Sequence, residues 1–179
     1  MLSRPELAKA IYDTSHLTGE FRLRSGVVSR EYFDKYLFEA EPALLRAIAE
    51  AMAELVPPET EVLAGLELGG VPVATALSYV SGLPAVFVRK KAKEYGTCKL
   101  AEGAAIDGRD VLIVEDVVTS GGQIVLSAKD LRARGATLSH AVCVVDREAG
   151  AAERLAAEGL ALHPLFTMTD LNHAAGVAG

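Results

Sequence analysis

The sequence predicts one α/β domain with a central, mostly parallel sheet flanked by helices. From residue 62 onward, short apolar runs alternate with stretches of helical length and pattern, as in chains that form a parallel sheet with crossover helices. The apolar runs are nearly continuous, which is typical of strands covered on both faces. The chain has 179 residues, 50% of them hydrophobic, enough for a single domain with a sizeable core.

The N-terminal part predicts one helix and two extended pieces. Residues 4–14 form a short amphipathic pattern. Residues 21–24 alternate apolar and basic side chains and predict a strand that ends at the Ser25-Gly26 pair. A second extended piece begins at Tyr32. The stretch DKYLFEAEP, residues 34–42, fits no pattern, and its charged side chains have no assigned role.

The remaining elements follow from periodicity and from glycine and proline punctuation. Pro42 stands in the first turn of a helix that the Pro57-Pro58 pair follows, and Gly135 and Gly159 each follow a helix end. The predicted helices are 42–55, 71–80, 123–134 and 151–158. The predicted strands are 62–66, 85–88, 111–114, 140–145 and 160–166.

Composition and spacing exclude several classes of protein. A net charge of −6 argues against a nucleic-acid-binding domain, and no apolar run is long enough to span a bilayer. Cys98 lies in a charged stretch and Cys143 in an apolar one, so we expect no disulfide framework and a reducing, cytoplasmic compartment. The four histidines show no metal-ligand spacing, and no Walker A or GxGxxG pattern occurs.

The most informative run is VLIVEDVVTSGG, residues 111–122. Its apolar start predicts a buried strand with Glu115 and Asp116 at the end, followed by a hydroxyl and glycine stretch before a helix. Small residues at a helix N-terminus let backbone N–H groups surround a phosphate. The two acids suit hydroxyls, or a cation, beside that phosphate. The run therefore predicts a ribose 5-phosphate site, the alternative being an ordinary strand followed by a capped helix.

This run resembles the phosphoribosyl pyrophosphate (PRPP) motif of type I phosphoribosyltransferases, and every position fits. The resemblance implies that residues 119–122 hold the 5′-phosphate. It also implies that Glu115 and Asp116 hold the ribose 2′- and 3′-hydroxyls and stabilise positive charge on the ribose. The implied PRPP-binding residues of this run are Glu115, Asp116, Val117, Val118, Thr119, Ser120, Gly121, Gly122 and Gln123.

A basic segment, residues 89–103, separates two of the predicted strands and shows no helical pattern. It reads RKKAKEYGTCKLAEG, and five of its first eleven residues are Lys or Arg. In a net acidic chain this clustering favours polyanion binding over a merely solvated loop. Pyrophosphate gains charge as it leaves PRPP, and cations aimed at it lower that barrier. A long loop here could also close over the site and exclude water.

The basic segment is similar to the catalytic loop of the orotate phosphoribosyltransferase family, which has two basic residues, a Lys three positions on, and a His or Tyr before Gly. The corresponding catalytic residues are Arg89, Lys90, Lys93 and Tyr95, joined by Asp116. Tyr95 keeps a hydrogen-bond donor where many members have His, but it cannot act as a cation.

Two other segments extend this resemblance to the acceptor. Residues 21–33, FRLRSGVVSREYF, are similar to the family's N-terminal stretch, and Arg147 follows the strand 140–145. A guanidinium binds a carboxylate through two parallel hydrogen bonds, and orotate has a carboxylate. The implied orotate-binding residues are Arg24, Tyr32, Phe33, Thr119 and Arg147. Apart from the resemblance, the aromatics could equally be core and Arg147 a surface charge.

The run LELGGVP, residues 66–72, occupies the place of the family's pyrophosphate loop. The resemblance implies that the backbone N–H groups of Leu68 and Gly69 bind PRPP. Some members carry Lys where this chain has Gly69. The alternative is a strand–helix turn that uses its glycines for geometry alone.

The resemblance covers roughly residues 20–166 of a single domain, 1–179, with a small hood formed by about residues 1–40 and the C-terminal segment. It implies transfer of the phosphoribosyl group from PRPP to orotate in UMP biosynthesis by a homodimer. Mg²⁺ would be carried mainly by PRPP, without a dedicated protein metal site. Two alternatives stay open: transfer to another base such as a purine, and a non-enzymatic PRPP-binding regulator.

Overall fold

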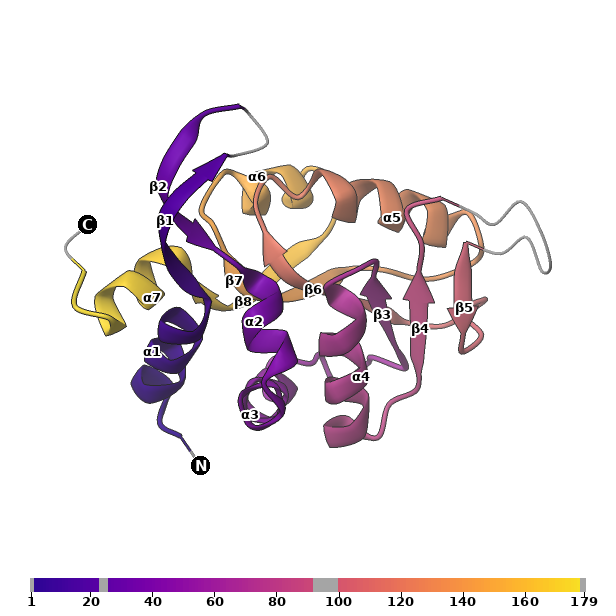
Figure 1. Ribbon diagram of the computed structural model, residues 1–179. Helices are drawn as coiled ribbons and strands as arrows, with labels where there is room; N and C mark the ends of the chain where they lie inside the picture. The colour runs from indigo at the N-terminus through magenta and orange to yellow at the C-terminus, as the bar shows by residue number, and fades with distance from the viewer. Residues whose placement is uncertain (1, 23–25, 92–99, 178–179) are drawn as a thin grey trace.

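The structure is a computed structural model that describes residues 2–22, 26–91 and 100–177. Its centre is a sheet with the strand order β5-β4-β3-β6-β7-β8 (Figure 1). The strands are β3 (Val62–Leu66), β4 (Ala85–Val88), β5 (Ala101–Gly103), β6 (Val111–Val118), β7 (His140–Asp146) and β8 (Ala161–Thr167). All neighbours are parallel except β5, which runs antiparallel to β4. The predicted α/β fold with a mostly parallel sheet is confirmed.

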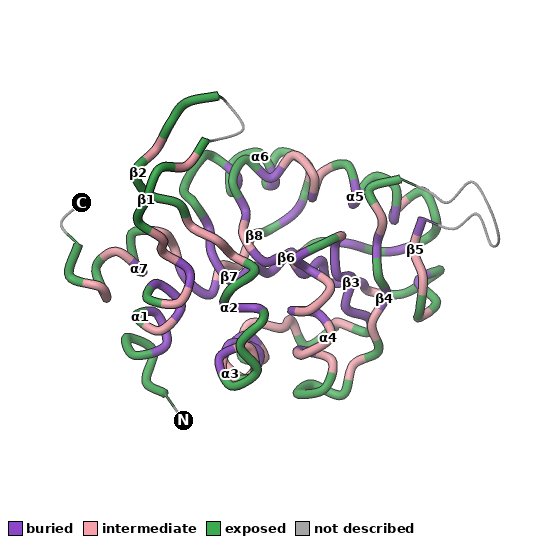
Figure 2. The backbone as a smooth tube through the Cα atoms, viewed as in Figure 1, coloured by how far each residue is buried: buried purple, intermediate pink, exposed green. Residues whose placement is uncertain are grey.

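Helices cover both faces of this sheet (Figure 1). They are α3 (Pro42–Ala53) and α4 (Gly70–Ser81) on one face, and α5 (Gly122–Arg132) and α6 (Ala151–Ala156) on the other. Successive strand residues point to opposite faces, so Leu112 joins the core under α3 and α4 while Ile113 joins the core under α5 and α6. The sheet therefore lies buried between two apolar layers (Figure 2).

The N-terminal segment builds a separate substructure. Helix α1 (Arg4–Ser15) leads into an antiparallel hairpin of β1 (His16–Arg22) and β2 (Val28–Phe33), which forms its own small sheet and projects beyond the main one (Figure 1). Helix α1 packs against the C-terminal helix α7 (Met168–Ala174). The predicted strand start at Phe21 is wrong, because pairing of the hairpin begins at His16.

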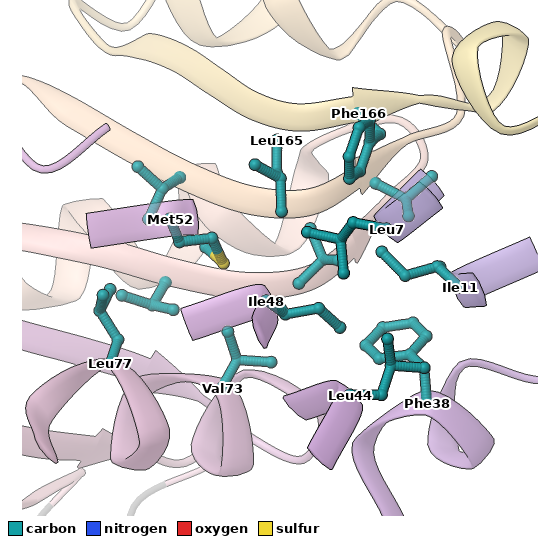
Figure 3. Packing of buried hydrophobic residues seen from close by; sticks show 14 of the residues in the cluster. Leu7, Ile11, Phe38, Leu44, Ile48, Met52, Val73, Leu77, Leu165 and Phe166 are labelled. Atoms are coloured by element: carbon teal, nitrogen blue, oxygen red, sulfur yellow. The ribbon is translucent and has the colours of Figure 1, made fainter. Parts of the chain in front are cut away.

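Helix α2 (Lys35–Ala40) follows the hairpin within the stretch that fits no sequence pattern. Asp34 caps it, since its side-chain Oδ1 accepts a hydrogen bond from the Tyr36 N–H at 3.1 Å. Phe38 is fully buried among core residues of α1, α3 and β8 (Figure 3). A six-residue helix is marginal by itself, so this apolar anchor holds α2 in place.

The strand that contains the two acids is longer than predicted. Strand β6 continues four residues past the predicted end at Val114, because Glu115 pairs with Cys143 of β7 and Val118 pairs with Asp146. The acids therefore lie within the ladder and not after it, and their backbone is fixed by the sheet. Strand β5 and helix α7 are likewise absent from the sequence-based prediction.

Candidate active site

Glu115 and Asp116 lie near the carboxyl end of β6, where open parallel sheets bind ligands. They are neighbours on a strand, yet their carboxyl groups lie within hydrogen-bonding reach of each other, against the same turn. Asp116 is 0% exposed, and Glu115 is mostly buried beside the glycines of the β3–α4 turn. The Val117 N–H donates to Asp116 Oδ1 at 2.6 Å. The ladder thus holds both carboxyl groups at one edge of the sheet.

Helix α2 supplies two partners for Asp116. Lys35 Nζ lies 2.6 Å from Asp116 Oδ2, and the buried carboxyl of Glu39 lies against Asp116 from the next helical turn. Burial alone would lower the pKa of Lys35, but the hydrogen bond and charge of Asp116 outweigh it, so the pKa of Lys35 is raised. The two acids of the motif are therefore the centre of a larger charged cluster.

This cluster shifts the protonation of its other two acids. Burial, followed by hydrogen bonding and charge from Asp116, raises the pKa of Glu39 to about 9. Burial and the charge of Asp116 raise the pKa of Glu115 to about 8, against the opposing charge of Lys35. Both shifts favour the protonated form of the two glutamates, and Lys35 is the cation paired with Asp116.

The turn between β3 and α4 passes directly over this cluster. A Cβ on Gly69 would overlap the carboxylate of Asp116, and a Cβ on Gly70 would overlap the carbonyl oxygen of Val114. Gly70 is thus required by the close approach of the turn to the β6 backbone, and Gly69 by the close approach of the turn to the Asp116 side chain. Leu68 is 60% exposed at the tip of the turn, and Gly69 lies against the Asp116 carboxylate.

The turn after β6 lines a cavity of about 320 Å³. The cavity's lining consists of Lys35, Glu115, Val117, Val118, Thr119, Ser120, Gly121, Gly122, Gln123 and Ile124. Gly121 has a φ of 72° immediately before α5, a conformation that favours glycine. The sequence-predicted phosphate loop and the acid Glu115 thus share one cavity at a helix N-terminus, and Lys35 joins them there.

The start of the basic segment is fixed next to the acid pair. The Lys90 N–H donates to Glu67 Oε2 at 2.9 Å, and the Arg89 N–H donates to the Leu100 carbonyl oxygen at 2.9 Å. The charge of Lys90 also contributes to the electrostatics at Glu115. Lys93 and Tyr95 lie outside the described residues.

The predicted acceptor residues are spread over two elements. Tyr32 and Phe33 are successive residues of β2 and so point to opposite faces: Tyr32 stacks on Phe21 with ring centroids 5.5 Å apart, while Phe33 lies near Phe38 at 6.5 Å. Arg147 is exposed just after β7, and its N–H donates to the Val118 carbonyl oxygen at 2.9 Å. Arg24 lies outside the described residues.

Sequence reasoning missed Lys35 and Glu39. The signal available was weak: the two residues are four apart, the spacing of one helix face, but a six-residue helix offers too little periodicity to detect. Within residues 2–22, 26–91 and 100–177, no group of three or more His, Cys, Asp or Glu side chains is arranged to hold a metal ion. In that same part of the chain, no helix is long and apolar enough to cross a membrane.

The chain is similar to known proteins in both sequence and fold. The family described as the phosphoribosyl transferase domain matches residues 38–159. An orotate phosphoribosyltransferase of Nocardioides sp. (strain ATCC BAA-499 / JS614) is 51% identical over 94% of either chain, and one of Pyrococcus abyssi is 43% identical over 98% of either chain. The solved structure of Mycobacterium tuberculosis H37Rv orotate phosphoribosyltransferase in complex with PRPP has a TM-score of 0.82 at 32% identity, covering 94% of this chain and 98% of that one.

Proposed function

This chain belongs to the orotate phosphoribosyltransferase family within the phosphoribosyl transferase domain proteins, and from that premise we propose that it transfers the 5-phosphoribosyl group of PRPP to orotate. The products are orotidine 5′-monophosphate and pyrophosphate. The observation that carries the proposal is the cavity in which the loop 119–123 and Glu115 meet, beside Asp116 at the carboxyl edge of the sheet. It offers a phosphate cradle and hydroxyl-binding acids side by side.

The donor is held by three groups of residues. Residues 119–122 bind the 5′-phosphate through backbone N–H groups at the start of α5, where the helix dipole favours negative charge, and Gln123 adds a further contact to PRPP. Glu115 and Asp116 bind the ribose hydroxyls. The backbone N–H groups of Leu68 and Gly69 bind the pyrophosphate, with Val117 and Val118 contacting the donor from β6.

The reaction is a displacement at the anomeric carbon. The bond from ribose C1′ to the pyrophosphate oxygen breaks and its electron pair leaves with pyrophosphate, while orotate N1, having lost its proton to solvent, bonds to C1′. Asp116 stabilises positive charge on the ribose, and Arg89, Lys90 and Lys93 stabilise negative charge on the leaving group. Tyr95 donates a hydrogen bond there.

The acceptor is held by its carboxylate and its ring. Arg147 stands beyond the end of β7, where its guanidinium binds the carboxylate. Arg24 and Thr119 add polar contacts, and Tyr32 of the hairpin flanks the pyrimidine, whereas Phe33 packs on the other side of β2 beside Phe38. A purine has no carboxylate, so the two arginines favour orotate over a purine acceptor.

Magnesium fits as a partner of the donor. The buried acid cluster already contains Lys35 as a counter-cation, and the described residues hold no three-ligand metal group of their own. Mg²⁺ carried by PRPP would neutralise pyrophosphate charge as the bond to C1′ breaks. We further propose a cytoplasmic homodimer acting in UMP biosynthesis, with the hairpin as part of a hood, on the strength of the family.

The test is pyrophosphate release from PRPP and Mg²⁺ against a panel of bases. Orotate should support release, whereas adenine, hypoxanthine and uracil should not. Release with a purine but not with orotate would favour the other acceptor class. No release with any base, although PRPP binds, would favour a regulator.

A further inference from the structure

Helix α2 supplies two residues that contact Asp116 from behind the candidate site. Its residues Lys35 and Glu39 are one helical turn apart and both reach Asp116. Between them in sequence, Phe38 is fully buried in the core (Figure 3) and fixes the helix against α1 and α3. The helix is thus anchored so that a cation and a carboxyl group face the same buried acid.

Lys35 provides the charge that a buried aspartate needs. An ionised carboxylate that is 0% exposed is strongly disfavoured unless a cation and hydrogen-bond donors accompany it. Lys35 Nζ at 2.6 Å from Oδ2 is the ion-pair partner, and the Val117 N–H satisfies Oδ1. The ion pair and the Val117 N–H together fix the orientation of the Asp116 carboxylate beside the cavity.

Glu39 contacts the same carboxyl group, that of Asp116, as an uncharged partner. Glu39 Oε1 and Asp116 Oδ2 are both shielded from solvent, and among the described residues no aligned donor reaches them apart from the Lys35 ammonium at Oδ2. Two carboxyl groups that face each other in this way share one proton, because two buried carboxylates in contact would repel each other. Because the Lys35 ammonium lies on Asp116 and not on Glu39, the shared proton belongs on Glu39, whose pKa is raised by burial and by Asp116.

The pair also lies under the loop that faces the leaving group. A Cβ on Gly69 would overlap Asp116 and would come within 3.0 Å of Glu39 Oε1. Any shift of α2 would therefore move Asp116 or open a gap beneath the turn.

We infer that Lys35 and Glu39 are positioning residues that keep Asp116 charged and oriented for the donor's ribose hydroxyls. The inference rests on the proposed function, because it presumes that PRPP binds at this site. It extends the site to the stretch 34–42, whose charged residues had no account from sequence.

A double-mutant cycle tests the role of Lys35. Lys35→Met should raise the Kd and KM for PRPP by at least about 10-fold, with the KM for orotate and the Kd for inorganic phosphate near wild type. In the Asp116→Asn background the same change should add little, because a neutral amide needs no cation. Lys129→Met is the matched control, since Lys129 pairs with Glu158 at 2.8 Å on the surface. Full additivity, or a Lys35→Met effect no larger than the control, would overturn the inference.

Glu39 is tested by variants that differ only in donor capacity. Glu39→Gln keeps a neutral hydrogen-bond donor and should stay within a few-fold of wild-type PRPP affinity, whereas Glu39→Leu should lose about 10-fold. Equal loss in both would remove the donor role. If Lys35→Met does not fold, the Lys35→Met, Asp116→Asn double variant should fold, and its failure would count against the inference. If the proposed function itself is wrong, wild-type protein will not release pyrophosphate from PRPP with orotate, a result distinct from all of these.

Discussion

Glu115 and Asp116 are adjacent in sequence, yet the strand gives them different surroundings. Asp116 turns inward to Lys35 and Glu39, while Glu115 lines the cavity formed by the loop 119–123. Burial raises the pKa of Glu115 to about 8, so in the free protein it can donate as well as accept a hydrogen bond at neutral pH. Asp116 is the acid paired with a cation, so we expect the electrostatic contribution to the proposed reaction to come from it.

Replacing Asp116 by Asn isolates that contribution. The amide keeps the size of the side chain but removes the charge that stabilises the ribose, so kcat should fall about 10²-fold, a typical effect of one electrostatic contact. Steady-state kinetics with PRPP and orotate give the measurement, and circular dichroism checks that the fold is intact. Wild-type turnover in this variant would remove Asp116 from the mechanism.

Replacing Arg147 by Ala separates the acceptor from the donor. Loss of a two-hydrogen-bond contact to the orotate carboxylate should raise the KM for orotate by about 10- to 100-fold and leave the KM for PRPP within a few-fold. Arg134→Ala is a suitable control, because Arg134 pairs with Asp130 on the surface, 4.0 Å apart. Equal changes in both KM values would argue against a carboxylate contact.

The residues that sequence could identify are those whose neighbours lie along the chain. The acids and the loop 119–122 belong to one continuous run, so their spacing alone predicts a site. Lys35 and Glu39 meet Asp116 from about eighty positions away, and only the fold brings them together. Nothing in a six-residue segment distinguishes such contacts from surface charges.

At the level of elements, long apolar runs were predictable and short pieces were not. Strands β3 and β7 are buried along nearly their whole length, and their sequences predict this. Strand β5 has three residues and α2 has six, fewer than a period needs to be recognised. The end of β6 was missed because two acids break its apolar pattern, although pairing to β7 continues past them.

Strands β7 and β8 carry a pair of histidines at the edge of the sheet opposite the candidate site. His140 Nδ1 lies 3.0 Å from His163 Nε2, and His140 Nε2 lies 3.2 Å from Glu59 Oε1. The short distance between the two ring nitrogens requires one of them to accept, so at least one ring is neutral. Burial and the charge of His140 lower the pKa of His163 from its ordinary value of 6.5.

This pair predicts a loss of stability in mild acid. Because the pKa of His163 is lowered on folding, the unfolded chain binds a proton at this residue more readily than the folded protein does. The contribution of neutral His163 to the free energy of unfolding is therefore present above pH 6.5 and is lost as the pH falls below that value. Between about pH 7.5 and 5.5, the Tm of wild type should fall by a few degrees more than that of His163→Gln. Identical pH dependence in the two proteins, measured by scanning calorimetry, would contradict the assignment.

On the scale of the whole molecule, the layers were predictable but the placement of the ends was not. Alternation of apolar runs with helical stretches requires helices on both faces of a sheet. The contact between α1 and α7 joins the two ends of the chain, and no local pattern encodes that. The proposed hood depends on this long-range contact.

The proposed dimer makes a prediction about how sites are assembled. If the basic segment reaches the neighbouring subunit of this dimer, Lys93 acts in a different site from the Asp116 of its own chain. Mixing inactive Asp116→Asn and Lys93→Ala proteins should then restore activity. Random exchange of subunits makes about half of the dimers hybrids. Each hybrid has one intact site and one site with both defects, so the mixture should reach about a quarter of wild-type activity.

A matched mixture shows whether the recovery comes from shared sites. Lys35 and Asp116 form their ion pair within one chain, so a hybrid of Asp116→Asn and Lys35→Met subunits has one defect in each site and should regain nothing. Recovery with Lys93→Ala but not with Lys35→Met would establish that the basic segment acts across the interface. If neither mixture recovers although size-exclusion chromatography and exchange of labelled subunits show hybrid dimers, the segment serves its own chain, and each protomer contains a complete site.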